Sequence, residues 1–93
     1  MKEEIENKVY ALYMVATQSL GFVHPRSISN YLWMYVSEFQ KHFDEIAFLD
    51  EIQQASERLA QKGLLERSDK KTKLSSCRYR ALTPVEIVQR KQK

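Results

Sequence analysis

The sequence predicts a mainly helical domain with a single β-hairpin. Three segments repeat their apolar residues with a period of about 3.6, the period of an α-helix with one buried face. Two short runs of alternating apolar and polar residues follow, separated by a lysine-rich segment, as in a pair of half-buried strands. The last segment opens with a helix-start signature. We therefore expect three helices, a two-stranded hairpin and a short C-terminal helix.

The first helix is expected over residues 1–20, with acidic residues in its first turn, where the helix dipole favours them. Its inward stripe comprises Ile5, Val9, Leu12, Tyr13, Ala16 and Leu20. Tyr10 and Met14 lie opposite this stripe and are candidates for a dimer interface, with cover by other segments of the chain as an equal alternative. A short extended piece is expected next, at Phe22 and Val23.

The second helix is expected over residues 25–39, because Pro25 suits a first helical turn. Its buried face comprises Ile28, Tyr31, Leu32, Tyr35, Val36 and Phe39. Trp33 lies off this face, and it is either an exposed anchor for a partner or, as we favour, an indole half-buried on a neighbouring loop. The polar residues 40–42 predict a turn.

The third helix is expected over residues 44–62, beginning at Asp44 or, after an interruption, at Asp50. Its inward face comprises Leu49, Ile52, Ala55, Ser56, Leu59 and Ala60. Gly63 follows, in the left-handed position that ends many helices.

The hairpin is expected over residues 64–82, with strands at 64–68 and 76–82. In the second strand, Cys77, Tyr79 and Ala81 alternate with Arg78 and Arg80. The segment from Thr83 to Glu86 then forms a capping box: a threonine cap, a proline in the first turn and a glutamate three residues after the cap. It predicts a short helix and basic tail over residues 83–93.

Length and composition favour one domain over residues 1–93, expected in the cytoplasm and away from membranes. The single cysteine, Cys77, excludes an internal disulfide and fits a reducing compartment, with a disulfide between two chains as the exception. The longest apolar run, residues 9–16, is too short to cross a membrane, and no signal sequence is recognisable.

The positive charge of the chain is concentrated in its C-terminal third. Residues 62–93 carry ten Lys and Arg against three acids, whereas residues 1–61 carry five against nine. The formal net charge of +3 therefore combines a basic hairpin region with an acidic remainder. Such segregation predicts a polyanionic partner, most commonly nucleic acid.

The sequence predicts neither an enzyme nor a metal or cofactor site. His24 and His42 stand far apart, without the Cys, Asp or Glu spacing of a metal site. There is no glycine-rich phosphate loop, and Cys77 faces inward in its strand as a small apolar residue.

Two stretches resemble winged helix-turn-helix transcription regulators. Residues 57–67 (ERLAQKGLLER) are similar to the junction of the recognition helix and the first wing strand in that family. Residues 79–84 (YRALTP) are similar to its second wing strand running into a closing helix, as in the multiple-antibiotic-resistance and phenolic-acid-response types and in small viral or plasmid proteins. The resemblance covers residues 22–86 and implies a winged helix-turn-helix fold.

The resemblance implies that the third helix enters the major groove of double-stranded DNA and that the hairpin, the wing, follows the phosphate backbone. The recognition-helix candidates are Gln53, Gln54, Glu57, Arg58 and Gln61. The wing candidates are Arg67, Lys70, Lys71, Lys73, Arg78 and Arg80, with the arginines on the solvent face of the strands. At the start of the second helix, Arg26, Ser27, Ser29 and Asn30 are candidates for phosphate contacts.

The predicted function is sequence-specific or semi-specific DNA binding by a homodimeric transcription regulator. Glu57 departs from the usual basic recognition helix, and the lysine-rich hairpin also suits a solvated sheet edge. One alternative is a plasmid or phage replication or partition protein that uses the same surface. The other is a protein-interaction winged helix that docks through Tyr10, Met14 and Trp33.

Overall fold

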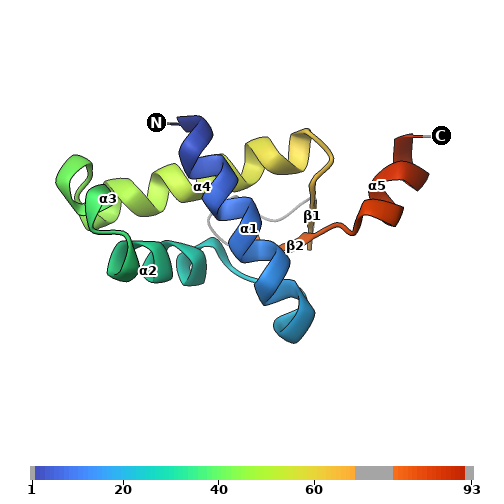
Figure 1. Ribbon diagram of the computed structural model, residues 1–93, viewed down its shortest axis with the longest axis horizontal. Helices are drawn as coiled ribbons and strands as arrows, with labels where there is room; N and C mark the ends of the chain where they lie inside the picture. The colour runs from blue at the N-terminus through green and yellow to red at the C-terminus, as the bar shows by residue number, and fades with distance from the viewer. Residues whose placement is uncertain (1, 69–76, 92–93) are drawn as a thin grey trace.

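The part of the chain that the structure describes folds as five helices and a two-stranded antiparallel sheet (Figure 1). The computed structural model describes residues 2–68 and 77–91. Its elements are α1 (Lys2–Leu20), α2 (Pro25–Tyr35), α3 (Ser37–His42), α4 (Glu45–Gln61), β1 (Leu65–Arg67), β2 (Tyr79–Ala81) and α5 (Pro84–Lys91). The expected class, mainly helical with one hairpin, is confirmed, but the expected number of helices is wrong. None of the described helices combines the length and apolar character needed to cross a membrane.

The additional helix arises from a break at Val36. A single helix over residues 25–39 and a turn over residues 40–42 were expected, yet Val36 has φ −118° and ψ 89° and α3 starts directly after it. The break re-aims the chain so that Phe39 is buried against Phe48, with ring centroids 5.1 Å apart. The side-chain amide of Gln40 donates a hydrogen bond to the Trp33 carbonyl near the interrupted helix end.

Both ends of α4 follow local sequence signals. Asp44 is its N-cap, and Asp44 Oδ1 accepts a hydrogen bond from the Ala47 amide at 2.7 Å. The start at Asp44 is therefore confirmed, and the helix continues through Asp50 without interruption. Gly63 has φ +80°, the left-handed conformation expected after the helix end.

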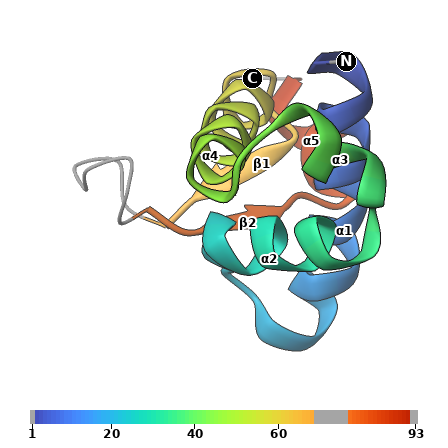
Figure 2. The ribbon, with the colours of Figure 1, turned by 90° about the vertical axis from the view of Figure 1, so that its left-hand side faces the viewer.

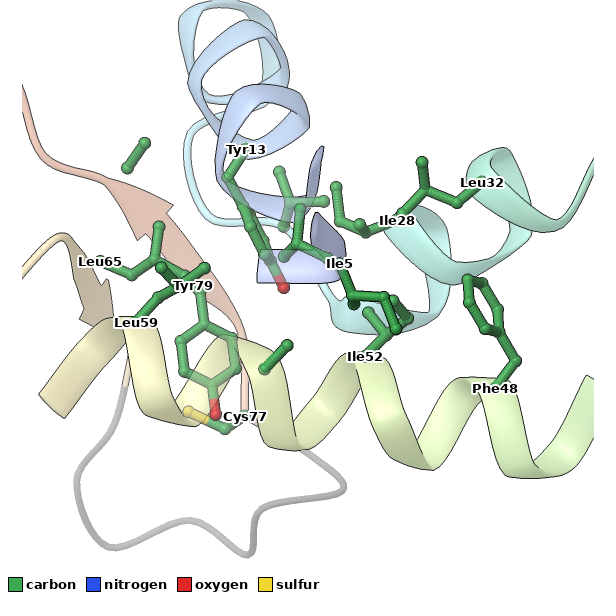
Figure 3. Close-up of a cluster of buried hydrophobic side chains, with 14 of the residues drawn as sticks. Ile5, Tyr13, Ile28, Leu32, Phe48, Ile52, Leu59, Leu65, Cys77 and Tyr79 are labelled. Carbon is green, nitrogen blue, oxygen red and sulfur yellow. The ribbon is translucent and has the colours of Figure 1, made fainter. Parts of the chain in front are cut away.

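The core forms around α4, which packs against α2, α1 and β1 (Figure 3). Its inward residues Phe48, Ile52, Ala55 and Leu59 are buried against side chains of these neighbours. Phe48 lies at the centre of an aromatic group with Phe39, Phe43 and Trp33, at centroid distances of 5.1 to 5.7 Å. The half-burial of Trp33 that we favoured is confirmed, but its ring packs against Phe48 of α4 and not only against a loop.

The two strands are shorter than expected, but the residues of β2 that were predicted to face inward do so. β1 and β2 pair in antiparallel register, with Leu65 opposite Ala81 and Arg67 opposite Tyr79. On the other edge of β2, Val23 and Tyr79 exchange backbone hydrogen bonds of 2.8 and 2.9 Å. The extended piece predicted at Phe22 and Val23 therefore adds one bridge to the sheet. Cys77, Tyr79 and Ala81 are buried, as their alternation predicts.

Parts of the predicted helix stripes lie outside the core. Ile5, Val9 and Tyr13 of α1 are fully buried, but Leu20 is 71% exposed because the C-terminal turn of α1 extends past the core. Likewise Tyr31 and Tyr35 of α2 are exposed and stack on each other, with centroids 4.6 Å apart. Of the two predicted dimer residues, Tyr10 packs partly against the core and Met14 is 39% exposed.

The capping box at the start of α5 is confirmed. The Thr83 amide donates to Glu86 Oε1 and the Glu86 amide donates to Thr83 Oγ1, both at 3.2 Å. Beyond this box, α5 contributes no buried residue to the domain. Figure 1 shows it projecting from the end of β2, away from α1 and α2.

We expect Ile52→Ala to lower the free energy of unfolding by about 2–5 kcal/mol, because it leaves a cavity in the fully buried face of α4. Ile46→Ala on the same helix is the matched control, since Ile46 is 83% exposed and its loss should change stability by less than about 0.5 kcal/mol. Urea denaturation followed by Trp33 fluorescence measures both. Equal effects of the two substitutions would contradict the assignment of the core.

Candidate nucleic-acid interface

The outer stripe of α4 and the hairpin lie on the same side of the molecule. Figure 2 shows α1 on one side, α4 on the other, and β1 and β2 extending away from α1 on the side of α4. Besides Glu45 and Ile46 in its first turn, the exposed residues of α4 are Ala47, Asp50, Gln54 and Gln61, whose spacings of three, four and seven residues place them on one face of the helix. This stripe, which we call the outer stripe of α4, carries one acid and no base.

Among the predicted recognition residues, Gln54 and Gln61 are exposed and Gln53 is half-buried. Gln54 Nε2 donates a hydrogen bond of 2.7 Å to Asp50 Oδ2, one helical turn earlier. Because a carboxylate only accepts hydrogen bonds, this contact fixes which end of the amide faces Asp50. The Gln54 amide retains its oxygen, which can accept from the N6 amino group of adenine, and its second N–H, which can donate to adenine N7 in the major groove.

Glu57 is directed toward the sheet. Glu57 Oε2 accepts a hydrogen bond of 2.8 Å from the Tyr79 hydroxyl, and Arg67 Nε lies 3.5 Å from the same oxygen. Burial and the neighbouring Glu57 carboxylate both raise the pKa of Tyr79, so its hydroxyl stays protonated and donating. The acid that departs from a basic recognition helix therefore links α4 to the hairpin.

Arg58 and Lys62 are directed toward α1. Arg58 Nε lies 3.2 Å from Glu6 Oε2, and Lys62 Nζ lies 2.7 Å from Glu6 Oε1. Arg58 also pairs with Glu51 at 3.6 Å. These two cations, led by the hydrogen bond from Lys62, hold the pKa of Glu6 below its ordinary value although burial opposes this. Arg58 therefore joins two helices and does not extend from the outer stripe of α4.

The Glu6 contact was not foreseen from the sequence, where Glu6 is one of several acids in the first turns of the helix. A signal was present nonetheless. Glu6 stands beside Ile5 and one turn before Val9, on the face that the apolar stripe assigns to the core. An acid in that position needs a cationic partner from another element.

Two of the three hairpin arginines are paired with acids. Arg80 Nη2 contacts Glu66, its partner across the strands, and Glu86 of α5 at 2.9 Å. Arg67 lies close to Glu57 and donates to Cys77 Sγ at 3.3 Å.

Arg80 lies on the face of β2 opposite the buried Tyr79 and Ala81, as expected, although its ion pairs leave its side chain only about one-quarter exposed. Arg67 lies opposite Tyr79 and shares its buried face, so the expectation that Arg67 lies on the solvent face is wrong.

The contact with Arg80 also changes the ionisation of Glu86. The hydrogen bond from Arg80, and then that from the Thr83 amide, lower the pKa of Glu86 to about 2.

Among the other predicted wing residues, Arg78 is exposed, as expected. Lys70, Lys71 and Lys73 lie outside the described residues.

The start of α2 lies next to the exposed arginine of the hairpin. Ser27 and Arg78 line a common cavity of about 240 Å³ together with Phe22 and His24. His24 Nδ1 accepts a hydrogen bond of 3.0 Å from the Arg26 amide and so caps the helix. The structure therefore brings two segments of the predicted interface together although they are about fifty residues apart in the sequence.

Three of the four candidates at the start of α2 are accessible. Arg26, Ser27 and Asn30 are exposed. Ser29 is only 3% exposed, because it lies on the inward side of the helix beside Ile28. The prediction that Ser29 contacts phosphate is wrong for this reason.

Within residues 2–68 and 77–91, no three His, Cys, Asp or Glu side chains are grouped closely enough to hold a metal ion. Cys77 is buried, and its sulfur accepts a hydrogen bond from the Arg67 guanidinium.

Comparison with known proteins adds no relative: no family model, curated protein or solved structure matches this chain.

We expect Glu6→Gln to lower the free energy of unfolding by about 1 kcal/mol at pH 7, because it removes the charge that pairs α1 with Arg58 and Lys62. The folded pKa of Glu6 lies below its ordinary value of 4.5, so its stabilising contribution is present above that pH and is lost as the pH falls through the folded value. The difference between wild type and variant should therefore disappear in strong acid.

Urea denaturation at neutral and acidic pH measures this difference. Glu3→Gln, which removes an exposed acid from the first turn of the same helix, is the control: it loses only the attraction between this charge and the helix dipole, which salt screens, so its effect at neutral pH should be smaller than that of Glu6→Gln. A difference between wild type and Glu6→Gln that persists in strong acid would show that the charge of Glu6 is not the stabilising factor.

Proposed function

We propose that this protein binds double-stranded DNA in the manner of a winged helix-turn-helix transcription regulator. The order of its elements supports the proposal: a helix, the bridging residue Val23, a second helix, a short third helix, a long fourth helix, a hairpin and a closing helix. In a winged helix, α4 would be the recognition helix and the β1–β2 hairpin the wing. α3 would replace the short turn of the helix-turn-helix.

The observation that carries the proposal is that Ser27, at the start of α2, and Arg78, in the hairpin, line the same cavity. In addition, α4 and the hairpin lie on the same side of the molecule (Figure 2). A helix start and an exposed arginine in contact with one cavity suit neighbouring oxygens of a phosphate backbone. The lysines at positions 70, 71 and 73 add positive charge between the two strands in the sequence. Both features favour a backbone grip by this part of the molecule.

The charge pairing within the hairpin limits how many phosphates the protein can neutralise. Arg67 and Arg80 are already paired with carboxylates, and separating such a pair would cost part of the gain from a phosphate contact. Arg26, Arg78 and the three lysines remain. If each of these five bases neutralises one phosphate, log Kd should change with log salt with a slope of about 4 to 5 per protomer.

Base recognition would rest on Gln54. It is exposed on the outer stripe of α4, and its amide is oriented by Asp50. The absence of a base on this stripe removes phosphate attraction from the recognition helix itself. We therefore propose semi-specific binding, in which the wing and the start of α2 supply affinity and Gln54 favours adenine at one position.

We expect Arg78→Glu to weaken binding to a fluorescent mixed-sequence duplex and to lower the slope of log Kd against log salt by about 1, because one phosphate contact is lost. Lys41→Glu changes the net charge equally but lies on α3, and it should leave the slope unchanged. Anisotropy titrations over a series of salt concentrations measure both. If both variants lower the slope equally, the change in net charge alone would explain the result, and a contact between Arg78 and a phosphate would be contradicted.

We expect Gln54→Ala to weaken binding to a selected target by about 1–3 kcal/mol and to leave binding to mixed-sequence DNA unchanged. Competition titrations with targets that differ at single base pairs should show relaxed preference at one adenine. Gln53→Ala is the control, because Gln53 is half-buried. A uniform loss on all sequences would exclude Gln54 as a base-reading residue.

A protein-interaction role is the second candidate, and the outer stripe of α4 favours it. This stripe has an acid and two glutamines but no cation, as suits contact with a neutral or basic protein surface. Absence of DNA binding at low salt, where non-specific contacts are strong, would favour this candidate over DNA binding. Replication and partition proteins would use the same DNA surface as a regulator, so they share its tests.

A further inference from the structure

An apolar groove lies between α1 and α2. It has a volume of about 220 Å³, and its lining includes Leu12, Val15, Ala16 and Leu20 from α1, with Ile28 and Tyr31 from α2. Val15, Leu20 and Tyr31 are all more than half exposed, and Tyr35 extends the surface by stacking on Tyr31. Contiguous apolar surface of this kind marks sites of protein association.

The α5 helix also exposes apolar side chains. Val85 and Val88 stand one turn apart and are more than half exposed. Hydrogen bonds and ion pairs join α5 to its own chain: Glu86 contacts Arg80 and Thr83, and Arg90 contacts Glu66. A helix of eight residues is too short to be stable in water through its backbone alone, so it gains from an apolar partner.

We propose that α5 of a second copy of this chain lies in the α1–α2 groove, and that two copies exchange this contact reciprocally to form a homodimer. Each copy supplies one groove and one α5, so a two-fold arrangement uses both and leaves neither exposed. The ion pairs to Glu66 and Arg80 hold α5 beside the hairpin of its own chain, away from α1 and α2 (Figure 1). The occupant of the groove therefore comes from another copy.

The available apolar area suffices for a dimer. Val15, Leu20, Tyr31, Tyr35, Val85 and Val88 are between 51% and 71% exposed. At roughly 200 Å² for a tyrosine and roughly 100 Å² for an aliphatic side chain, their exposed parts amount to about 500 Å² per copy. A pair would bury about 1,000 Å², the lower bound for a specific protein interface.

This interface differs from the one predicted from the sequence. Tyr10 and Met14 do not line the groove, and Tyr10 already packs against its own core. The proposal also stands apart from DNA binding, since none of its contacts involves a base or a phosphate. Failure of one proposal therefore leaves the other intact.

Sedimentation equilibrium of the full chain and of two charged variants tests the proposal. We expect the wild type to dimerise, and Val15→Asp in the groove and Val88→Asp in α5 each to weaken the dimer by at least about tenfold. Both positions are exposed in the single copy, so each variant should keep the wild-type circular dichroism spectrum. Ile46→Asp is the matched control, because Ile46 is 83% exposed at the start of α4 and should have no effect.

Mixing the two variants separates reciprocal exchange from other arrangements. The intact α5 of the Val15→Asp chain can enter the intact groove of the Val88→Asp chain, so the mixture should associate more strongly than either variant alone. No gain on mixing would overturn the exchange, as would a wild-type chain that stays monomeric. A dimer that survives deletion of residues 84–93 would show that the α1–α2 surfaces pair directly, and it would also overturn the proposal.

Discussion

The packing of α4 against three neighbours is the constraint on which the rest of the structure depends. α2, α1 and β1 each cover part of its circumference, and the aromatic group around Phe48 closes one end. Arg58 and Glu57, which lie next to each other in the sequence, are drawn to opposite neighbours, Arg58 to Glu6 of α1 and Glu57 to Tyr79 of β2. Apart from the exposed Glu45 and Ile46 of its first turn, the outer stripe is the part of α4 left for a partner, so its composition limits what this helix can bind.

Features that depend on residues within one helical turn were predicted well. The Asp44 cap, the left-handed Gly63 and the Thr83–Glu86 capping box each involve backbone groups no more than four residues away. The break at Val36 was not foreseen, because the apolar period continues through it and only the position of Phe48 makes the change of direction favourable. Periodicity identifies a helix face but not what covers it.

The candidate site was harder to predict than the fold, for an electrostatic reason. Which arginines remain available depends on which acids lie within about 4 Å in the folded chain, and these partners are distant in sequence. Arg58 and Glu6 are 52 residues apart, and Tyr79 and Glu57 are 22 apart. From the sequence alone, arginines that the fold pairs with acids and arginines that it leaves exposed were all assigned to the DNA-binding surface. The structure separates them and leaves Arg26 and Arg78 exposed near the start of α2.

The central proposal is that DNA binds to the surface formed by the outer stripe of α4, the hairpin and the start of α2. The most direct measurement is a titration of the isotope-labelled protein with a short mixed-sequence duplex at low salt, following the amide chemical shifts. The account predicts the largest changes at Arg26, Gln54 and Arg78, and none at the exposed α1 residues Asn7 and Ala11. Changes centred on α1, or no changes at all under these conditions, would contradict it.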